Sequence, residues 1–222
     1  MLGFVLEYII ESMKKCISVA LTIVILTGLV GCGSSRDQAQ EDNTTWEDAN
    51  SFLYEFDTQL HGVVIIRYIG ENADVVIPSE IDNHPVKSIN DSAFAYCNSL
   101  ISITIPDSVT SIGGFAFRDC TNLTTVDLPR RLKTISNFMF AGCESLTSIS
   151  IPDRVTSIYN NAFSGCHGLE SVDIPKSVKG IGPEAFSDCW SLSDATREKI
   201  LGISPWALDD DVFTDHLVEN DQ

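Results

Sequence analysis

Apolar residues recur at fixed places of a 23-residue unit through the middle of the chain. A leucine, then an apolar residue before a proline, then a phenylalanine before a cysteine repeat in the same order. Between them, apolar and polar positions alternate over short stretches, which is typical of strands because successive side chains point to opposite sides. A period of about 20–50 residues is typical of a solenoid. The pattern therefore predicts a stack of similar coils.

The cysteine and phenylalanine columns are the most regular features of the repeat. We expect both to form a structural ladder inside the stack, with each thiol filling a narrow turn as a small apolar group. A disulfide framework is the alternative for an exported chain, but five cysteines in one column are an odd number. The columns are Cys97, Cys120, Cys143, Cys166 and Cys189, and Phe94, Phe117, Phe140, Phe163 and Phe186.

The unit that begins at Leu146 shows how one coil is expected to fold. Residues 146–151 are predicted as a strand in which Ser148 and Ser150 point outward and the two isoleucines point into the core. Pro152 ends this strand because it has no amide donor. The rest of the unit is predicted as a second short strand, Val155–Ile158, and a return turn or single helical turn, Asn161–Cys166.

These units resemble the BspA-type leucine-rich repeat family, whose repeat reads roughly LTSVTIPxSVTSIGxxAFxxC. Residues 100–120 read LISITIPDSVTSIGGFAFRDC. The resemblance covers about residues 60–192, including a longer opening unit, Val76–Cys97, with an insertion near His84. It implies a β-rich leucine-rich-repeat solenoid of about five 23-residue coils, and a place among surface proteins implicated in adhesion.

Both ends of such a stack need a cap, since open strand edges invite further pairing. Upstream, Phe52–Asp57 and Gly62–Ile69 are predicted as two strands of an N-terminal β cap. Downstream, Ser193 is a candidate N-cap for a short helix, Asp194–Leu201, with Gly202 as its stop signal. We expect this helix to close the last coil.

The start of the chain has the features of a secretory signal. Lys14 and Lys15 precede an apolar run, and the run ends in Leu-Val-Gly-Cys at Cys32, which resembles a bacterial lipobox. The resemblance implies that Cys32 is the lipid attachment site. An uncleaved membrane anchor is the alternative, although the run is just short of a standard span. The acidic residues ahead of the lysines favour a translation start at Met13.

The residues after Cys32 are almost free of apolar side chains and are predicted to form a flexible tether. The expected organisation is a signal peptide at residues 1–31, a tether at 32–50, a β cap at 51–76, the solenoid at 77–192, and a helical cap with an acidic tail at 193–222.

The charge of the chain and its lack of catalytic and metal-binding motifs argue against nucleic-acid binding, catalysis and metal binding. The formal net charge is -17, with the repeats themselves close to neutral, so nucleic-acid binding is not expected. The four histidines are scattered and no catalytic motif is present, so we predict neither an enzyme nor a cofactor. No Cys-x-x-Cys pair suggests a metal site. The acidic run 209–211 lacks the spacing of a calcium loop and is interpreted as a solvated tail.

The remaining class of function is binding to another molecule through the protein surface. The candidate binding face is formed by the outward residues of the first strand of each coil. This face is rich in hydroxyls, weakly acidic and free of aromatic side chains, which suits contact with a protein. Ordinary solvated strand residues are the alternative interpretation. The face consists of Ser102, Thr104, Thr125, Asp127, Ser148, Ser150, Ser171 and Asp173. A second candidate is a basic ridge after each proline, formed by Arg130, Arg131, Arg154 and Lys176, with Lys133 and Lys179 nearby.

The sequence therefore predicts a lipid-anchored, exported, non-enzymatic binding module at the bacterial cell surface. Its expected partner is an extracellular or envelope protein, and the chain itself is expected to be a monomer. Adhesion to host or neighbouring-cell proteins comes by analogy with the resembling family. The alternative is an inward-facing envelope scaffold that organises other envelope proteins or cell-wall components.

Overall fold

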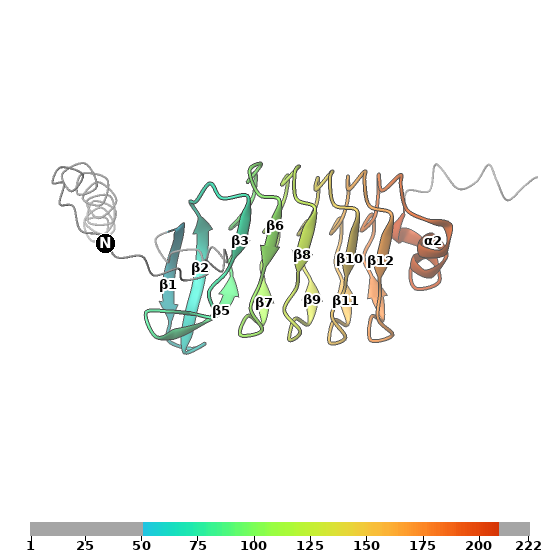
Figure 1. Cartoon of the computed structure of the whole chain (residues 1–222). Coiled ribbons are helices and arrows are strands. Elements are labelled where there is room, and N and C mark those ends of the chain that lie inside the picture. The colour runs from blue at the N-terminus through green and yellow to red at the C-terminus, as the bar shows by residue number, and fades with distance from the viewer. Residues whose placement is uncertain (1–50, 209–222) are drawn as a thin grey trace, which may run out of the picture. The chain divides into compact units, whose positions relative to one another are not determined.

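The computed structural model describes residues 51–208, which form a solenoid of about five coils. The strands of successive coils lie side by side, with β1 (Phe52–Asp57) and β2 (Gly62–Tyr68) at one end and the helix α2 (Asp194–Leu201) at the other (Figure 1). The fold class predicted from the repeat is confirmed. The predicted signal peptide, the lipid attachment site Cys32, the tether and the acidic tail 209–222 lie outside the described residues.

The N-terminal cap is a pair of antiparallel strands, β1 (Phe52–Asp57) and β2 (Gly62–Tyr68), close to the predicted ones. β2 pairs in parallel with β5 (His84–Ile89), a strand of the opening coil. The inserted stretch forms a tight hairpin from β4 (Glu80–Ile81) into β5. The two residues of its turn have φ angles of 52° and 61°, as a two-residue type I′ loop requires. β2 therefore covers the first open edge of the stack.

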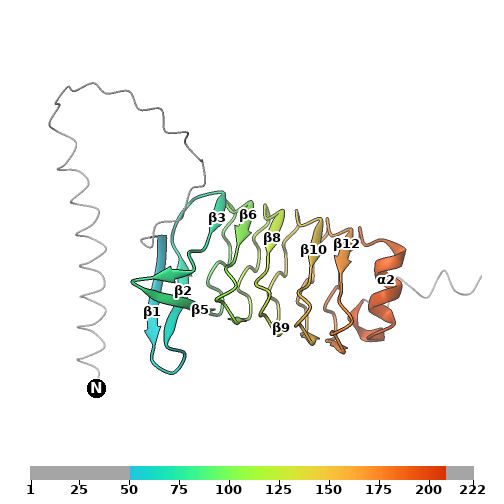
Figure 2. The same ribbon diagram turned by 60° about the horizontal axis from the view of Figure 1, so that its bottom comes forward.

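Each coil adds one short strand to each of two parallel faces, and Figure 2 shows the strands of the first face in one row. The first strand face consists of β3 (Asp74–Val76), β6 (Ser102–Thr104), β8 (Thr125–Asp127), β10 (Ser148–Ser150) and β12 (Ser171–Asp173). The second strand face continues from β5 with β7 (Ser111–Ile112), β9 (Thr134–Ile135), β11 (Ser157–Ile158) and β13 (Gly180–Ile181).

The strands alternate as predicted but are shorter than predicted. In β10, Ile149 is buried while Ser148 and Ser150 are exposed, and Ile151 just beyond the strand is buried as well. The strand is short because Leu146 donates its amide to Cys143 in the preceding turn, at 3.2 Å, rather than to a neighbouring strand.

The third side of the coil is a turn face, and it is not a helical turn. It consists of Ser92–Tyr96, Phe115–Asp119, Phe138–Gly142, Asn161–Gly165 and Glu184–Asp188, and the first and last residue of every segment has a positive φ. This geometry aims amides at the next coil: Phe117 donates to the Met139 carbonyl at 2.9 Å, and Phe140 to that of Ala162 at 2.8 Å. The turn face is therefore a third hydrogen-bonded ladder.

The phenylalanine column forms the centre of the core. Its five members are at most 1% exposed. Neighbouring rings are stacked with centroids 5.0 to 5.4 Å apart. Tyr68 of the cap extends the column at 5.2 Å from Phe94. Aromatic pairs in this offset arrangement add stability beyond the apolar area that they bury.

The cysteine column consists of free thiols. Four are buried, but Cys97 in the first coil is only half-buried. Each buried thiol also donates a hydrogen bond to a phenylalanine carbonyl of the preceding coil, at 3.0 to 3.2 Å. Burial away from water raises the pKa of Cys120 to about 12 and that of Cys143 and Cys166 well above the ordinary value.

The C-terminal cap contains α2 (Asp194–Leu201), whose bounds match the prediction. Ser193 precedes it, but its side chain makes no capping hydrogen bond. Its hydroxyl instead pairs with that of Thr196 at 2.9 Å. A 3₁₀ helix, Pro205–Ala207, that the sequence did not reveal completes the turn ladder, since Phe186 donates to Ala207 at 2.8 Å.

Candidate binding surface

The first strand face is not one continuous sheet. β3, β6 and β8 form one parallel sheet, and β10 and β12 form another. The second strand face is also divided, between β7 and β9. Coil 123–145 therefore pairs with the preceding coil through β8 and with the following coil through β9. The turn face continues across both interruptions, since Phe115 donates to Asn137 and Phe138 to Asn160 at 3.0 and 3.1 Å.

The core of coil 123–145 differs from that of its neighbours. Met139 takes the place of an alanine and Leu132 that of a valine, and both are at most 1% exposed. Extra methylene groups in a packed interior force backbone shifts. The two interruptions lie on either side of this coil.

A cavity of about 670 Å³ opens where the first strand face is interrupted. Val126 of β8 is half-buried there, whereas the matching residues Ile103, Ile149 and Val172 are buried. Aliphatic residues of both coils line the cavity together with charged residues of the ridge. The lining is Asp107, Val126, Asp127, Leu128, Arg130, Arg131, Ser150, Ile151, Pro152, Asp153, Arg154 and Asp173.

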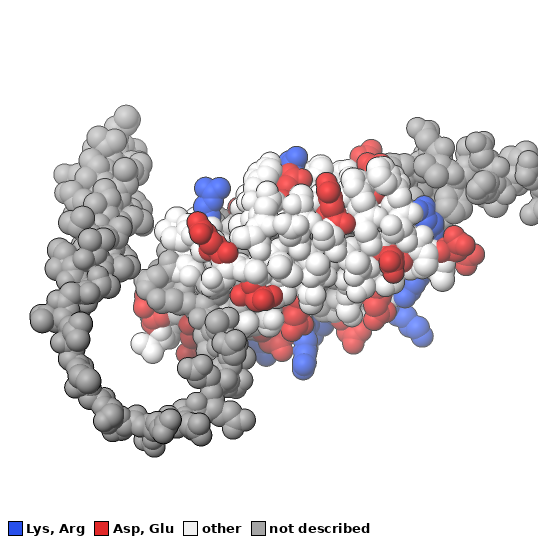
Figure 3. All heavy atoms as spheres, turned by 45° about the horizontal axis from the view of Figure 1, so that its top comes forward, with Lys and Arg blue, Asp and Glu red and all other residues white. Residues whose placement is uncertain are grey.

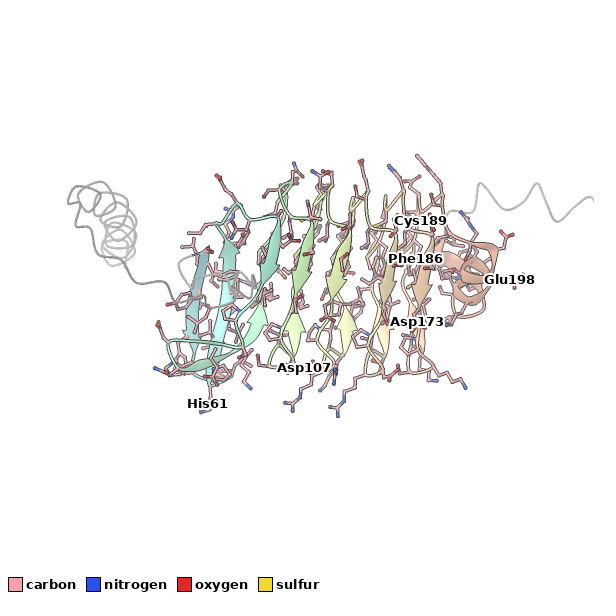
Figure 4. All side chains as sticks on the ribbon, viewed as in Figure 1. His61, Asp107, Asp173, Phe186, Cys189 and Glu198 are labelled. Carbon is pink, nitrogen blue, oxygen red and sulfur yellow. The ribbon has the colours of Figure 1, made fainter. Side chains whose placement is uncertain are left out.

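The charges around the cavity are of both signs. Asp107 accepts a hydrogen bond from the Arg130 amide at 2.8 Å, and its carboxylate lies 3.8 Å from the Arg130 guanidinium. Within residues 51–208, neither Arg131 nor Arg154 forms an ion pair. Figure 4 labels Asp107 at the lower rim of the stack and Asp173 on β12. In Figure 3, which shows the top turned forward, acidic side chains are scattered over the surface and basic ones project at both the upper and the lower edge.

The structure joins the two surfaces that the sequence indicated separately. Three predicted residues of the strand face, Asp127, Ser150 and Asp173, line the cavity together with three arginines of the ridge. The other predicted residues lie outside the cavity on β6, β8, β10 and β12: Ser102, Thr104, Thr125, Ser148 and Ser171. Ser102 is half-buried and donates to Asp74 of β3 at 2.5 Å.

Sequence reasoning missed Asp107, Asp153 and the partial exposure of Val126. The coil beside the cavity departs from the repeat at Met139 and Leu132. Sequence reasoning also missed an exposed aromatic surface away from the strand faces, where Trp190 is 65% exposed and stacks on His167 at 4.3 Å.

Among residues 51–208, no group of His, Cys, Asp and Glu is arranged to hold a metal ion. Over the same range, no helix combines the length and the apolarity that crossing a bilayer needs.

The family model of the BspA type leucine rich repeat region matches residues 87–211 in six copies. A leucine rich cell surface protein from Faecalibacterium prausnitzii has a similar solved structure, with 37% identity and a TM-score of 0.58. The match covers 67% of this chain and 40% of that one.

Two further solved structures are similar to this chain. A leucine-rich repeat protein from Bacteroides ovatus is 33% identical with a TM-score of 0.56, over 64% of this chain and 39% of that one. A leucine rich repeat protein from T. pallidum is 25% identical with a TM-score of 0.50, over 74% of this chain and 98% of that one.

No functionally curated protein matches the chain. This chain spans about 40% of the length of the F. prausnitzii and B. ovatus structures. The family and the fold point to a non-enzymatic repeat protein with a protein-interaction surface. Because the family model covers more than half of the 222 residues, the chain belongs to the BspA-type leucine-rich repeat family.

Proposed function

We propose that this chain is a lipid-anchored protein-binding module at a bacterial cell surface, and that its partner contacts the first strand face. The observation that carries the proposal is the exposed row of hydroxyls and carboxylates on β8, β10 and β12, interrupted by a cavity. A rigid solenoid presents such a row without an ordering cost, and binding then comes from many shallow contacts.

Two observations support the location. Residues 29–32 resemble a lipobox, so a lipid on Cys32 would hold the module at a membrane and the polar residues after it would set its reach. The similar F. prausnitzii structure is described as a cell surface protein. In this proposal the partner is an extracellular or envelope protein, the chain acts as a monomer, and adhesion is its role.

Protease treatment of intact cells tests the location. With an antibody against the repeats, we expect rapid loss of the protein from wild-type cells, and release of a Cys32→Ser variant into the medium. Protection on intact cells that ends only after envelope permeabilisation would contradict surface display and would favour the inward-facing envelope scaffold.

Photo-cross-linking on living cells tests the face. A photoreactive amino acid at Ser148, on the first strand face, is compared with one at Asn160, which is exposed beside the turn face. We expect a defined adduct with an extracellular or envelope protein from position 148 and none from position 160. Equal adducts from both positions would contradict binding through the first strand face.

A further inference from the structure

The cavity between β8 and β10 has the size and floor of a ligand site. Its volume of about 670 Å³ lies within the usual range for such sites. Val126, Leu128, Ile151 and Pro152 provide an apolar floor where the two sheets separate. The facing edges of β8 and β10 are not paired with each other, so their backbone groups face this opening.

Two arginines lie on opposite sides of the interruption. Arg131 and Arg154 occupy the same place in successive coils, where the flanking coils have Ser108 and Ser177. Both arginines line the cavity and are exposed. Arg130 already contacts Asp107, whereas these two form no ion pair within the described residues. A guanidinium with free donors binds a carboxylate through two parallel hydrogen bonds.

Carboxylates lie on the strand side of the same cavity. Asp127 and Asp173 hold matching places on β8 and β12, with Ser150 between them on β10, while the earlier coils have Thr104 and Val76 there. They form no ion pair within the described range. This side therefore favours a cationic group.

The mixture of charges excludes a ligand of a single sign. A polyanion that reaches the two arginines would also meet the carboxylates of Asp107, Asp127, Asp153 and Asp173. A polycation would meet the arginines. A peptide with both signs and an aliphatic side chain matches every part of the lining.

We propose that the cavity binds an extended peptide segment of the protein partner. An acidic side chain of this segment bonds to Arg131 and Arg154, an aliphatic side chain lies on the floor at Val126, and a basic side chain faces Asp127 and Asp173. The proposal rests on the proposed function in requiring a protein partner, and it adds the chemistry of the segment that is recognised.

The test is a selection of displayed random peptides on the full chain purified in detergent. Enriched peptides are synthesised and their Kd is measured on the wild type and on two double variants. R131A/R154A removes the proposed contact. K176A/K179A removes the same charge from the same ridge one coil away, where Lys179 contacts the Lys176 carbonyl. Thermal melting checks that both variants are folded.

We expect enriched peptides to combine an acidic, an aliphatic and a basic residue. R131A/R154A should weaken their binding by about tenfold or more, since hydrogen bonds to charged groups are strong, and K176A/K179A should change it by less than about twofold. Changing the acidic residue of the peptide to its amide should weaken binding to the wild type as much as R131A/R154A does.

Three results would overturn this proposal. Equal binding to both double variants would place the peptide elsewhere, and competition by inorganic polyphosphate stronger than by the peptides would indicate a polyanion site. A selection without enrichment would exclude the cavity as a peptide site. None of these results bears on surface display, which the protease and cross-linking experiments decide separately.

Discussion

The turn face and the first strand face are built from the same five coils, yet only the turn face is continuous. Its amides donate hydrogen bonds from each coil to the next through the whole stack. The ladder begins with Ser92, which donates to Gly114, and ends with Phe186, which donates to Ala207. The first strand face is interrupted between β8 and β10, which are not paired. The phenylalanine and cysteine columns lie beneath the turn face, because they belong to it or follow it directly.

The residues that stabilise the stack and the residues proposed to contact a partner therefore lie on different faces. The turn face joins the coils through its hydrogen-bonded ladder and the two buried columns beneath it. The first strand face can therefore lose a strand pairing without the hydrophobic core being divided. Residues that depart from the repeat, such as Arg131 and Arg154, gather where the pairing is lost. In repeat proteins each coil is stabilised mainly by its neighbours, so the effects of substitutions should depend on the face.

The largest expected effect comes from the phenylalanine column. Phe140 is fully buried between Phe117 and Phe163, at 5.3 and 5.4 Å, so Phe140→Ala should lower the free energy of unfolding by about 3–5 kcal/mol. Val126→Ala, at the interruption, should lower it by about 1 kcal/mol or less, since Val126 is already half-exposed. Urea unfolding measures both, and similar losses would contradict the division between the faces.

A second expected effect is loss of stability at alkaline pH. Burial raises the pKa of Cys143 well above its ordinary value of 9.0, so the folded state retains a thiol proton that the unfolded state releases. The contribution of this thiol is complete below about pH 9 and is lost as the pH rises towards the pKa of the folded state, at about 1.4 kcal/mol per pH unit.

The cysteine effect is measured by urea unfolding at several pH values on the wild type and on Cys143→Ala. Above about pH 9, the free energy of unfolding of the variant should fall less steeply with pH than that of the wild type. The difference between the two slopes should equal the contribution of one thiol. Identical slopes in the two proteins would show that the Cys143 thiol is ionised in the folded state as readily as in the unfolded state.

Two glycines provide a smaller and more direct comparison. Gly165 on the turn face has a φ of +73°, and an added Cβ would find room there, so Gly165→Ala measures backbone strain alone. The expected cost is about 1 kcal/mol. Gly180 in β13 has open space around it and no positive φ. Gly180→Ala should raise stability by about 0.4–1 kcal/mol. Thermal melting of both variants checks the opposite signs.

The smallest expected effect is at the C-terminal cap. Because the Ser193 hydroxyl makes no capping bond and pairs only with the Thr196 hydroxyl, Ser193→Ala should cost about 0.5 kcal/mol, whereas a bonded N-cap costs about 1 kcal/mol when removed. A measured loss well above 1 kcal/mol would show that the hydroxyl stabilises α2 by more than its bond to Thr196. The cap would then depend on its side chains as well as on the turn ladder.

The parts of this fold that the sequence could predict are those in which residue type repeats with position. Leucine, phenylalanine and cysteine columns keep one residue type through the stack, so the coils, their burial and the outward serines of β10 follow from spacing. The bounds of α2 could be predicted as well, since a serine and a glycine border it.

The left-handed positions of the turn face could not be predicted, because their residue types vary. The first such position of each coil is Ser92, Phe115, Phe138, Asn161 and Glu184. No glycine indicates it, and two of these residues are bulky side chains that rarely adopt a positive φ. The ring stack of Phe115 on Phe138, at 4.8 Å, is a contact that stabilises this conformation.

The cavity could not be predicted either, because a repeat pattern does not show where neighbouring strands fail to pair. Met139 and Leu132 differ from the alanine and valine of other coils by a few carbon atoms. A pattern of apolar positions does not distinguish these residues. The missing pairing between β8 and β10 appears only when whole coils are stacked.

The interruptions around coil 123–145 also have a mechanical consequence. The bonds of every ladder run along the direction in which the coils stack, so a pull between the two ends of the solenoid loads them directly. The junctions on either side of this coil each lack one strand pairing, and they would yield before the others. The unbroken turn face would then act as a hinge, and the cavity would widen under tension while both halves stayed folded.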